Sequence, residues 1–170
     1  MQKPLSNEYA VDYQKYFDLL PEGDYLDLLR QNTLETARFF EDLPSEKLDY
    51  KYAENKWTVK EVFMHIIDTE RVFSYRGLVA ARGDNVTQIY RMDEELYAKN
   101  ADVSQRSLQS LVSEFKAVRS STEQLFITVT DEQSKLQCSI VTHPMTARAI
   151  GYFIIGHVQH HVNVIKERYL

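Results

Sequence analysis

The chain carries the stretch GHVQHH at residues 156–161, and this stretch holds three of its five histidines. Apolar residues flank it at helical spacing from Ala149 to Ile165, which predicts an amphipathic helix with one buried face. His157 and His161 lie four residues apart, so both imidazoles leave that helix from the same face, one turn apart. This spacing lets one helix give two nitrogen ligands to one metal ion. A third ligand must then come from elsewhere in the chain.

Length and composition fit one helical domain. The 170 residues suit a single domain with its own core, and 44% of them are hydrophobic and 26% charged. Only five glycines and four prolines are present, so few turns are signalled and long helices are expected. The net charge is −5 and no basic residues cluster on one face, which argues against nucleic acid as a partner. We therefore expect a single domain over residues 1–170.

Cysteine content and the N-terminal residues bear on compartment and chemistry. Cys138 is the only cysteine, so no internal disulfide and no cysteine-based zinc motif can form. The first residues lack the apolar run of a signal peptide. The longest apolar runs, such as residues 152–155, are too short to span a bilayer. We expect a cytoplasmic protein without a membrane partner.

Four amphipathic helices are expected, after a short helical leader at residues 1–22 whose aromatic side chains pack across the bundle. Their expected N-caps are Asp24, Thr58, Ser104 and Thr146, and their expected ends lie near residues 42, 81, 129 and 169. The second start is the clearest, because TVKE at residues 58–61 fits a capping box. Residues 84–103 and 131–145 are longer connections. Residues 136–141 alternate loosely and could form a short extended piece, but we expect no sheet there. These features predict an all-α four-helix bundle with two crossovers.

His65 is the candidate third ligand. It lies inside the second predicted helix, where a neutral imidazole among apolar neighbours loses hydration unless its ring nitrogens find partners. One divalent ion would satisfy His65, His157 and His161 together. Three imidazoles leave coordination positions open, as in catalytic rather than structural sites. Three neutral nitrogen donors suit Zn, Ni or Fe(II), and the sequence does not choose among them.

Other assignments of these residues stay open. A single buried histidine is more often structural than a ligand, so a bundle without an ion is the alternative. His157 could pair with His160, three residues on, which would leave His161 outside; His160 could also support a ligand or line the entrance. Asp68, one turn after His65, could orient its imidazole through the second nitrogen or could pair with a nearby arginine. No acidic residue neighbours the histidine pair on its own helix, so no general base is evident there.

Several motifs, in their order along the chain, resemble the DinB/YfiT-like superfamily of proposed metalloenzymes. They are WTVKE at residues 57–61, His65, DTER at 68–71, GH at 156–157, HH at 160–161 and RYL at 168–170. The resemblance covers nearly the whole chain, and one histidine on the second helix with an H-x-x-x-H pair on the fourth is this family's arrangement. It implies a four-helix bundle with up-down-down-up topology and one divalent metal ion. It places the ligands on His65, His157 and His161.

The resemblance also implies a function and partners. Members are often homodimers; some are thiol-dependent S-transferases that use bacillithiol or related low-molecular-weight thiols, and others are described as metal-dependent hydrolases. We expect a divalent-metal-binding homodimer that acts as such an S-transferase on a small-molecule substrate. A metal-dependent hydrolase, or a non-enzymatic metal-stabilised binding or stress-response protein, is the alternative.

One stretch departs from the family pattern. Members with this C-terminal pattern tend to carry a Leu-Pro-Gly-Phe-Asp-like stretch after the second helix. This chain instead reads QIYRMDE at residues 88–94. If this crossover lies over the pocket, we expect a substrate that differs from theirs.

Overall fold

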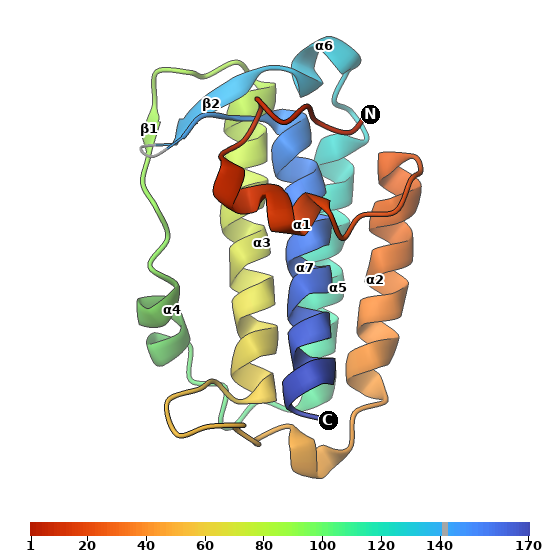
Figure 1. Ribbon diagram of the computed structural model, residues 1–170, viewed down its shortest axis with the longest axis vertical. Helices are drawn as coiled ribbons and strands as arrows, with labels where there is room; N and C mark the ends of the chain where they lie inside the picture. The colour runs from red at the N-terminus through yellow and green to blue at the C-terminus, as the bar shows by residue number, and fades with distance from the viewer. Residues whose placement is uncertain (141–142) are drawn as a thin grey trace.

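Four long helices form the body of the protein. The computed structural model describes residues 1–140 and 143–170. The long helices are α2 (Tyr25–Glu41), α3 (Val59–Ala81), α5 (Leu108–Phe126) and α7 (Ala147–Arg168). In Figure 1, α2 and α7 run downward, while α3 and α5 run upward. Seen from the other end, this order is up-down-down-up, so the predicted bundle and its topology are confirmed.

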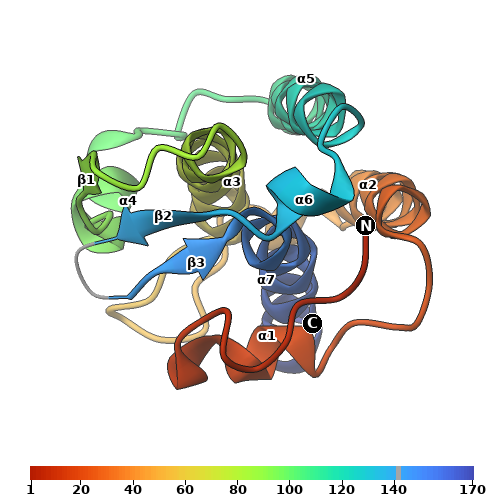
Figure 2. The same ribbon diagram turned by 90° about the horizontal axis from the view of Figure 1, so that it is seen from above.

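The order of the helices forces a long return of the chain. Both α2 and α3 contact α5 and α7, and Figure 2 shows the bundle from above. Because α3 and its neighbour α5 run in the same direction, the chain must travel back along the bundle between them. This return contains β1 (Gln88–Ile89) and α4 (Glu94–Asn100). The short helix α4 packs beside α3, so the return covers one side of that helix.

Side-chain caps fix where three of the long helices begin. Thr58 Oγ1 accepts a hydrogen bond from the Glu61 amide at 3.1 Å, and the Glu61 carboxylate accepts one from the Thr58 amide at 2.6 Å. The predicted capping box at the start of α3 is therefore confirmed. Asp24 and Thr146 cap α2 and α7, also as predicted.

The start of α5 differs from the prediction. Ser107, not Ser104, caps this helix by accepting a hydrogen bond from the Ser110 amide at 3.1 Å. The Ser104 hydroxyl instead donates to the Asp102 carboxylate at 2.7 Å. Both serines precede the helical pattern. The turn at Asp102, whose φ is 33°, pairs this carboxylate with Ser104 and leaves Ser107 to cap the helix.

Apolar side chains fill two clusters along the bundle. In one cluster the rings of Phe40 and Phe63 stack with 3.6 Å between centroids, and in the other Phe73 and Phe153 stack at 4.0 Å. Phe153 also lies against the imidazole of His157, with 5.3 Å between the ring centroids. The contact between α3 and α7 therefore joins core packing directly to the histidines.

A small sheet ties the two crossovers together, so the expectation of no sheet is wrong. β1 pairs in parallel with β2 (Gln137–Ile140), and β2 pairs antiparallel with β3 (Met145–Thr146). The register places Gln88 opposite Ser139 and Cys138 opposite Met145. Most of the loosely alternating stretch 136–141 is thus strand, and residue 141 lies outside the described residues. β1 and β3 have two residues each and carry no period, and the partner of β1 lies some fifty residues away in the chain, so the sequence gives little signal for this pairing.

The leader crosses the bundle over α7 (Figures 1 and 2). It contains the 3-10 helix η1 (Val11–Tyr13) and α1 (Gln14–Phe17). Two further short helices, η2 (Ser45–Lys47) and α6 (Asp131–Ser134), lie outside the leader. Tyr13 and Tyr16 both place their rings edge-on against Phe153. Gly156 permits this close approach, because a Cβ there would lie 2.8 Å from the Tyr16 carbonyl carbon. The leader is therefore docked next to the histidines of α7.

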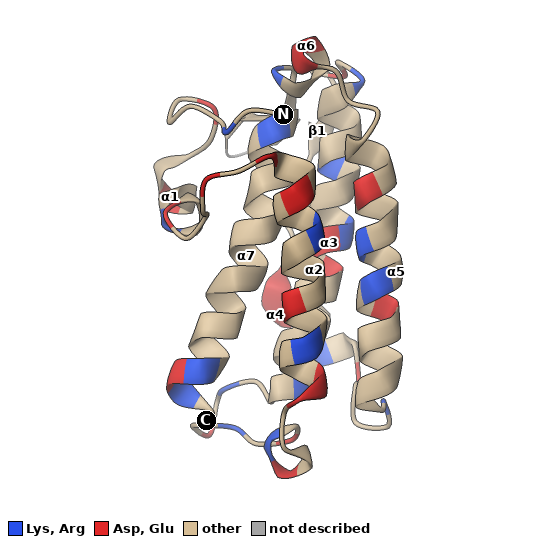
Figure 3. Cartoon of the chain, turned by 90° about the vertical axis from the view of Figure 1, so that its right-hand side faces the viewer, with Lys and Arg blue, Asp and Glu red and all other residues tan. Residues whose placement is uncertain are grey.

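Charged residues are distributed differently on α7 than on α2 and α5. Figure 3 shows Lys and Arg interspersed with Asp and Glu along α2 and α5, whereas most of α7 carries neither. Residues 147–158 of α7 are all buried. Within the described residues, no helix combines the length and the apolar character that crossing a membrane needs.

Alanine at position 156 should displace the leader. The added methyl group would meet backbone atoms of Tyr16, so we expect the free energy of unfolding to fall by about 1–3 kcal/mol and proteolysis within residues 1–22 to become faster. Gly151→Ala is the matched control on α7, because a Cβ there would meet only side-chain atoms of Met1 and Tyr25, at 3.1 Å. Urea denaturation and limited proteolysis measure the two effects. Equal behaviour of both variants would contradict the docking of the leader through Gly156.

Candidate metal centre

His65, His157 and His161 come together where α3 and α7 pack side by side. His65 lies within the first two turns of α3, just after the capping box that fixes the start of this helix. The other two histidines lie at the middle of α7 and one turn beyond it. The ring of Trp57, the residue before the cap, lies against His65 with 4.9 Å between centroids. Ordinary helix packing therefore positions all three imidazoles.

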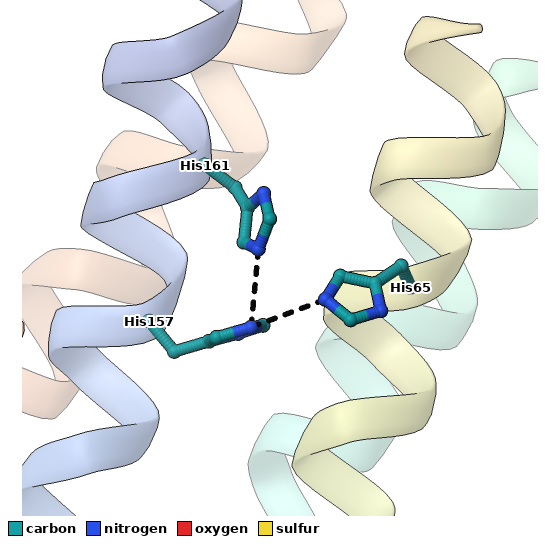
Figure 4. Close-up of side chains that lie close together, drawn as sticks. All are labelled: His65, His157 and His161. Atoms are coloured by element: carbon teal, nitrogen blue, oxygen red, sulfur yellow. Dashed lines mark hydrogen bonds between the residues drawn. The ribbon is translucent and has the colours of Figure 1, made fainter. Parts of the chain in front are cut away.

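The three rings direct one nitrogen each toward a common point (Figure 4). His157 Nε2 lies 3.2 Å from His65 Nε2 and 3.1 Å from His161 Nε2. The potential ligand atoms of the three residues all lie within 4.8 Å of one another. His157 is only 5% exposed, and the other two are partly buried. This group could hold a metal ion.

Hydrogen bonds among the three imidazoles cannot satisfy all of them. Each ring nitrogen of a neutral imidazole either donates one hydrogen bond or accepts one. His157 Nε2 faces both His65 Nε2 and His161 Nε2, so at least one of these two contacts lacks a good hydrogen bond. A divalent cation accepts the lone pairs of all three nitrogens at once. The donor set therefore fits a single ion of a metal such as Zn, Ni or Fe.

Burial keeps these histidines uncharged. It lowers the pKa of His65 to about 4. It also holds the pKa values of His157 and His161 well below their usual range, and repulsion from the neighbouring imidazoles adds to this effect. All three rings are therefore neutral at pH 7 and offer lone pairs rather than positive charge, as metal ligation requires.

Asp68 does not orient the imidazole of His65, so that prediction is wrong and the alternative pairing holds. The Asp68 carboxylate accepts a hydrogen bond from Arg71 at 3.2 Å, and His65 Nδ1 has no hydrogen-bond partner among the described residues. Arg71 is itself held by Glu114 of α5 at 2.6 Å. This ion-pair network links Asp68, through Arg71, to α5.

His160 lies beside the cluster rather than in it. Its ring packs against Tyr16 with 5.3 Å between centroids and against His161 with 5.1 Å. Of the two spacings open on α7, the pair four residues apart is the one that converges with His65. His160 lines the neighbouring pocket, as does the exposed His143.

A cavity of about 510 Å³ includes the three imidazoles in its wall, and its size suits a small organic molecule. The leader, α3, α7 and the crossover after α3 all contribute to it. The aromatic residues of the wall are Tyr13, Tyr16, Trp57, Phe73 and Phe153, and the charged ones are Asp12, Lys15, Arg76, Arg91, Glu94 and Glu95. Rings and charges of both signs therefore surround the space next to the histidines.

The sequence alone assigns no role to most of these wall residues. Arg76 could have been found from the sequence, because it lies eleven residues after His65 and therefore on nearly the same face of α3. Arg91 and Glu94 could not have been found in this way, since only the return of the chain beside α3 brings them to the cavity. The stretch at residues 88–94, which departs from the family pattern, thus contributes to the pocket.

Comparison with known proteins places the chain in a family. The model of the DinB superfamily matches residues 25–165. The chain belongs to the DinB superfamily. The resemblance noted in the sequence is thereby confirmed. A search of curated proteins finds no significant match to this DinB superfamily member.

Solved structures share the fold at low sequence identity. YfiT from Bacillus subtilis, described as a probable metal-dependent hydrolase with an unusual four-helix bundle topology, has a TM-score of 0.75 and 19% identity, over 98% of this chain and 90% of YfiT. The mycothiol-dependent maleylpyruvate isomerase has a TM-score of 0.67 and 14% identity, over 88% of this chain but only 62% of the isomerase. The DinB-like protein YjoA from Bacillus subtilis has a TM-score of 0.60 and 18% identity, over 85% of this chain and 88% of YjoA.

Metal-free protein should lose stability on acidification. Burial lowers the pKa of His65 to about 4, whereas the ordinary pKa of histidine is 6.5. Below pH 6.5 the imidazole therefore binds a proton in the unfolded chain but stays neutral in the native state. Stability is therefore fully present above pH 6.5 and falls as the pH drops, by about 2 kcal/mol between pH 7 and pH 5 for His65 alone. Urea denaturation at each pH measures the fall. In His65→Leu the fall in the free energy of unfolding should be smaller. An equally steep fall would contradict a buried neutral imidazole at this position.

Proposed function

We propose that the protein binds one divalent metal ion through His65, His157 and His161 and uses it in a reaction on a small molecule. The observation that carries this proposal is the convergence of three uncharged imidazole nitrogens on the wall of a cavity of about 510 Å³. Three protein ligands leave coordination positions for a substrate, which is the pattern of catalytic rather than structural sites. Membership of the DinB superfamily supports the same assignment.

The residues of the site have distinct roles in this proposal. A bound divalent ion supplies Lewis acidity, which lowers the pKa of a thiol or of water. The buried imidazoles hold the ion through neutral nitrogens and keep their own protons out of the reaction. Trp57 and Phe153 pack against His65 and His157 and help to hold these two rings in place. Tyr16, on the docked leader, closes another side next to His157.

We infer that the reaction is the transfer of a low-molecular-weight thiol to an organic electrophile. A sulfur–carbon bond forms, the leaving group departs, and the thiol proton passes to solvent. The aromatic wall of the cavity suits the electrophile, and the shared fold with a mycothiol-dependent isomerase supports a thiol as cosubstrate. The only cysteine of the chain, Cys138, is buried and does not line the cavity, so the thiol comes from outside.

Metal-dependent hydrolysis is the second candidate. It is favoured by the likeness to YfiT, which is described as a probable metal-dependent hydrolase. The same three imidazoles would serve, with water in place of the thiol. Turnover of esters or amides without any added thiol distinguishes this reaction from S-transfer.

Zinc should raise the melting temperature of the metal-free protein, because a ligand that binds only the folded state stabilises it. His157→Ala should abolish this shift, whereas His160→Ala should keep it, since His160 lies on the same helix but outside the converging group. Elemental analysis of protein purified without a polyhistidine tag should find one ion per chain in the wild type. Equal zinc binding by the two variants would remove the proposed centre.

Zinc-loaded or nickel-loaded protein should conjugate a low-molecular-weight thiol to members of a panel of electrophiles. We expect His157→Ala to lower the rate by more than about 100-fold, because even the loss of an outer partner of a metal ligand costs about 10–100-fold. Product formation is followed by mass spectrometry. Rates that match in wild type and variant exclude catalysis at this centre, and a metal-dependent rise in melting temperature without turnover would indicate a binding protein.

A further inference from the structure

Three arginines are almost completely buried among the described residues, and two of them have carboxylate partners. Arg119 is 1% exposed and contacts Glu70 through Nε at 3.0 Å and through Nη2 at 2.9 Å. Arg148 is 6% exposed, and its Nε donates to Glu8 at 2.7 Å. Arg76 is 2% exposed, yet no described carboxylate lies within ion-pair distance of it. Arg76 is also the one of the three that lines the cavity beside the histidines.

The guanidinium of Arg76 is held in place but is not neutralised. Its Nη2 donates to the Tyr90 carbonyl at 3.0 Å, and the group lies over the Phe73 ring, 4.4 Å from the centroid. Its Nε is buried without a hydrogen-bond partner among the described residues. Arginine keeps its charge in proteins, and a buried charge without a counter-ion is costly. An anion bound from the cavity would complete this arrangement.

Arg76 and His65 belong to one face of α3, and that face forms one wall of the cavity. Its lining residues are His65, Thr69, Phe73 and Arg76. The Thr69 hydroxyl is buried and, within the described part of the chain, also lacks a hydrogen-bond partner. The helix rises about 16 Å from His65 to Arg76, and the arginine leans back over Phe73 toward the histidines. A molecule roughly 10 Å long can therefore reach from one end to the other.

Carboxylates and cations both line the rest of the cavity. The Glu94 carboxylate has a cation of its own, because it lies 3.7 Å from Arg91 Nη2. After burial, the groups that act on the pKa of Arg76 are two tyrosines and Cys138, none of them a carboxylate. Among the described residues, Arg76 is therefore the buried cation of the cavity wall that has no carboxylate beside it.

We propose that Arg76 binds a carboxylate of the small molecule that occupies the cavity, with Phe73 against its apolar part and the Thr69 hydroxyl as a hydrogen-bond donor. This inference deepens the proposed function and rests on it only for the end of the ligand that meets the three histidines. The carboxylate belongs either to the thiol cosubstrate or to the electrophile. Both sources present the same chemistry to the guanidinium.

Two matched pairs of probes, titrated by calorimetry, separate these sources. 6-Mercaptohexanoate and 6-mercaptohexanol represent the thiol, and 4-methylbenzoate and 4-methylbenzyl alcohol represent an unreactive electrophile. The thiol pair is titrated into zinc-loaded protein, and both pairs are titrated into metal-free protein. We expect the carboxylate of at least one pair to bind about 10-fold more tightly than its alcohol. The pair that shows this preference identifies the molecule that carries the carboxylate.

Variants assign the preference to Arg76. Arg76→Met should reduce the affinity ratio of carboxylate to alcohol to about 1. Arg71→Met is the matched control on α3, because Arg71 pairs with Asp68 and Glu114 instead, and it should leave the ratio unchanged. A purely structural role of Arg76 would weaken both members of a pair equally and leave the ratio as it was. A wild-type ratio near 1 for both pairs, or an undiminished ratio in Arg76→Met, would overturn the inference.

Two further measurements cover the cases in which Arg76→Met does not fold or the protein binds no zinc. If Arg76→Met does not fold, Arg76→Lys replaces it; lysine lacks the planar fork, so the ratio should still fall, and an unchanged ratio counts against the inference. Zinc binding is measured on the same samples. A carboxylate preference in metal-free protein that binds no zinc would remove the proposed function alone, whereas zinc binding without any carboxylate preference would remove this inference alone.

Discussion

The contact between α3 and α7 buries three imidazoles whose nitrogens cannot all be satisfied by one another. Desolvation makes the charged form of each ring unfavourable, so the interface contains lone pairs directed at a common point. Helix packing creates this situation because His65 lies on the face of α3 that meets α7, and His157 and His161 lie one turn apart on the facing side. The same burial that stabilises the bundle thus prepares a ligand set for a cation.

The topology of the bundle supplies the surroundings of this centre. Because α3 and α5 are parallel neighbours, the chain has to return along α3, and the return brings the region around α4 to the cavity. The leader closes another side, where Gly156 lets backbone approach backbone beside His157. The other residues that line the cavity therefore come largely from the leader and the connections, while the residues that could hold a metal come from the long helices. Within one fold, the connections can change the substrate without disturbing the imidazoles.

Buried charge is handled in two ways in this protein. Arg119 and Glu70 neutralise each other inside the bundle and join α5 to α3. Arg76 is buried to a similar extent but faces the cavity, and its contacts are a carbonyl group and an aromatic ring. The first arrangement has its counter-charge within the fold and serves packing. The second gains its counter-charge only from a molecule in the cavity, so the energetic cost of its burial is tied to binding.

The sequence by itself determined the four helices, the capping box at Thr58 and the common helix face of His157 and His161, because these features depend on residues a few positions apart. It also pointed to His65 and, through its ordered motifs, to the DinB superfamily. The resemblance already favoured His161 over His160, and the converging rings agree with it. Only the tertiary structure paired Asp68 with Arg71, formed the small sheet and brought the leader and the crossover to the cavity. Each of these outcomes depends on groups far apart in the chain, whose distances follow from how the helices pack and not from any local pattern.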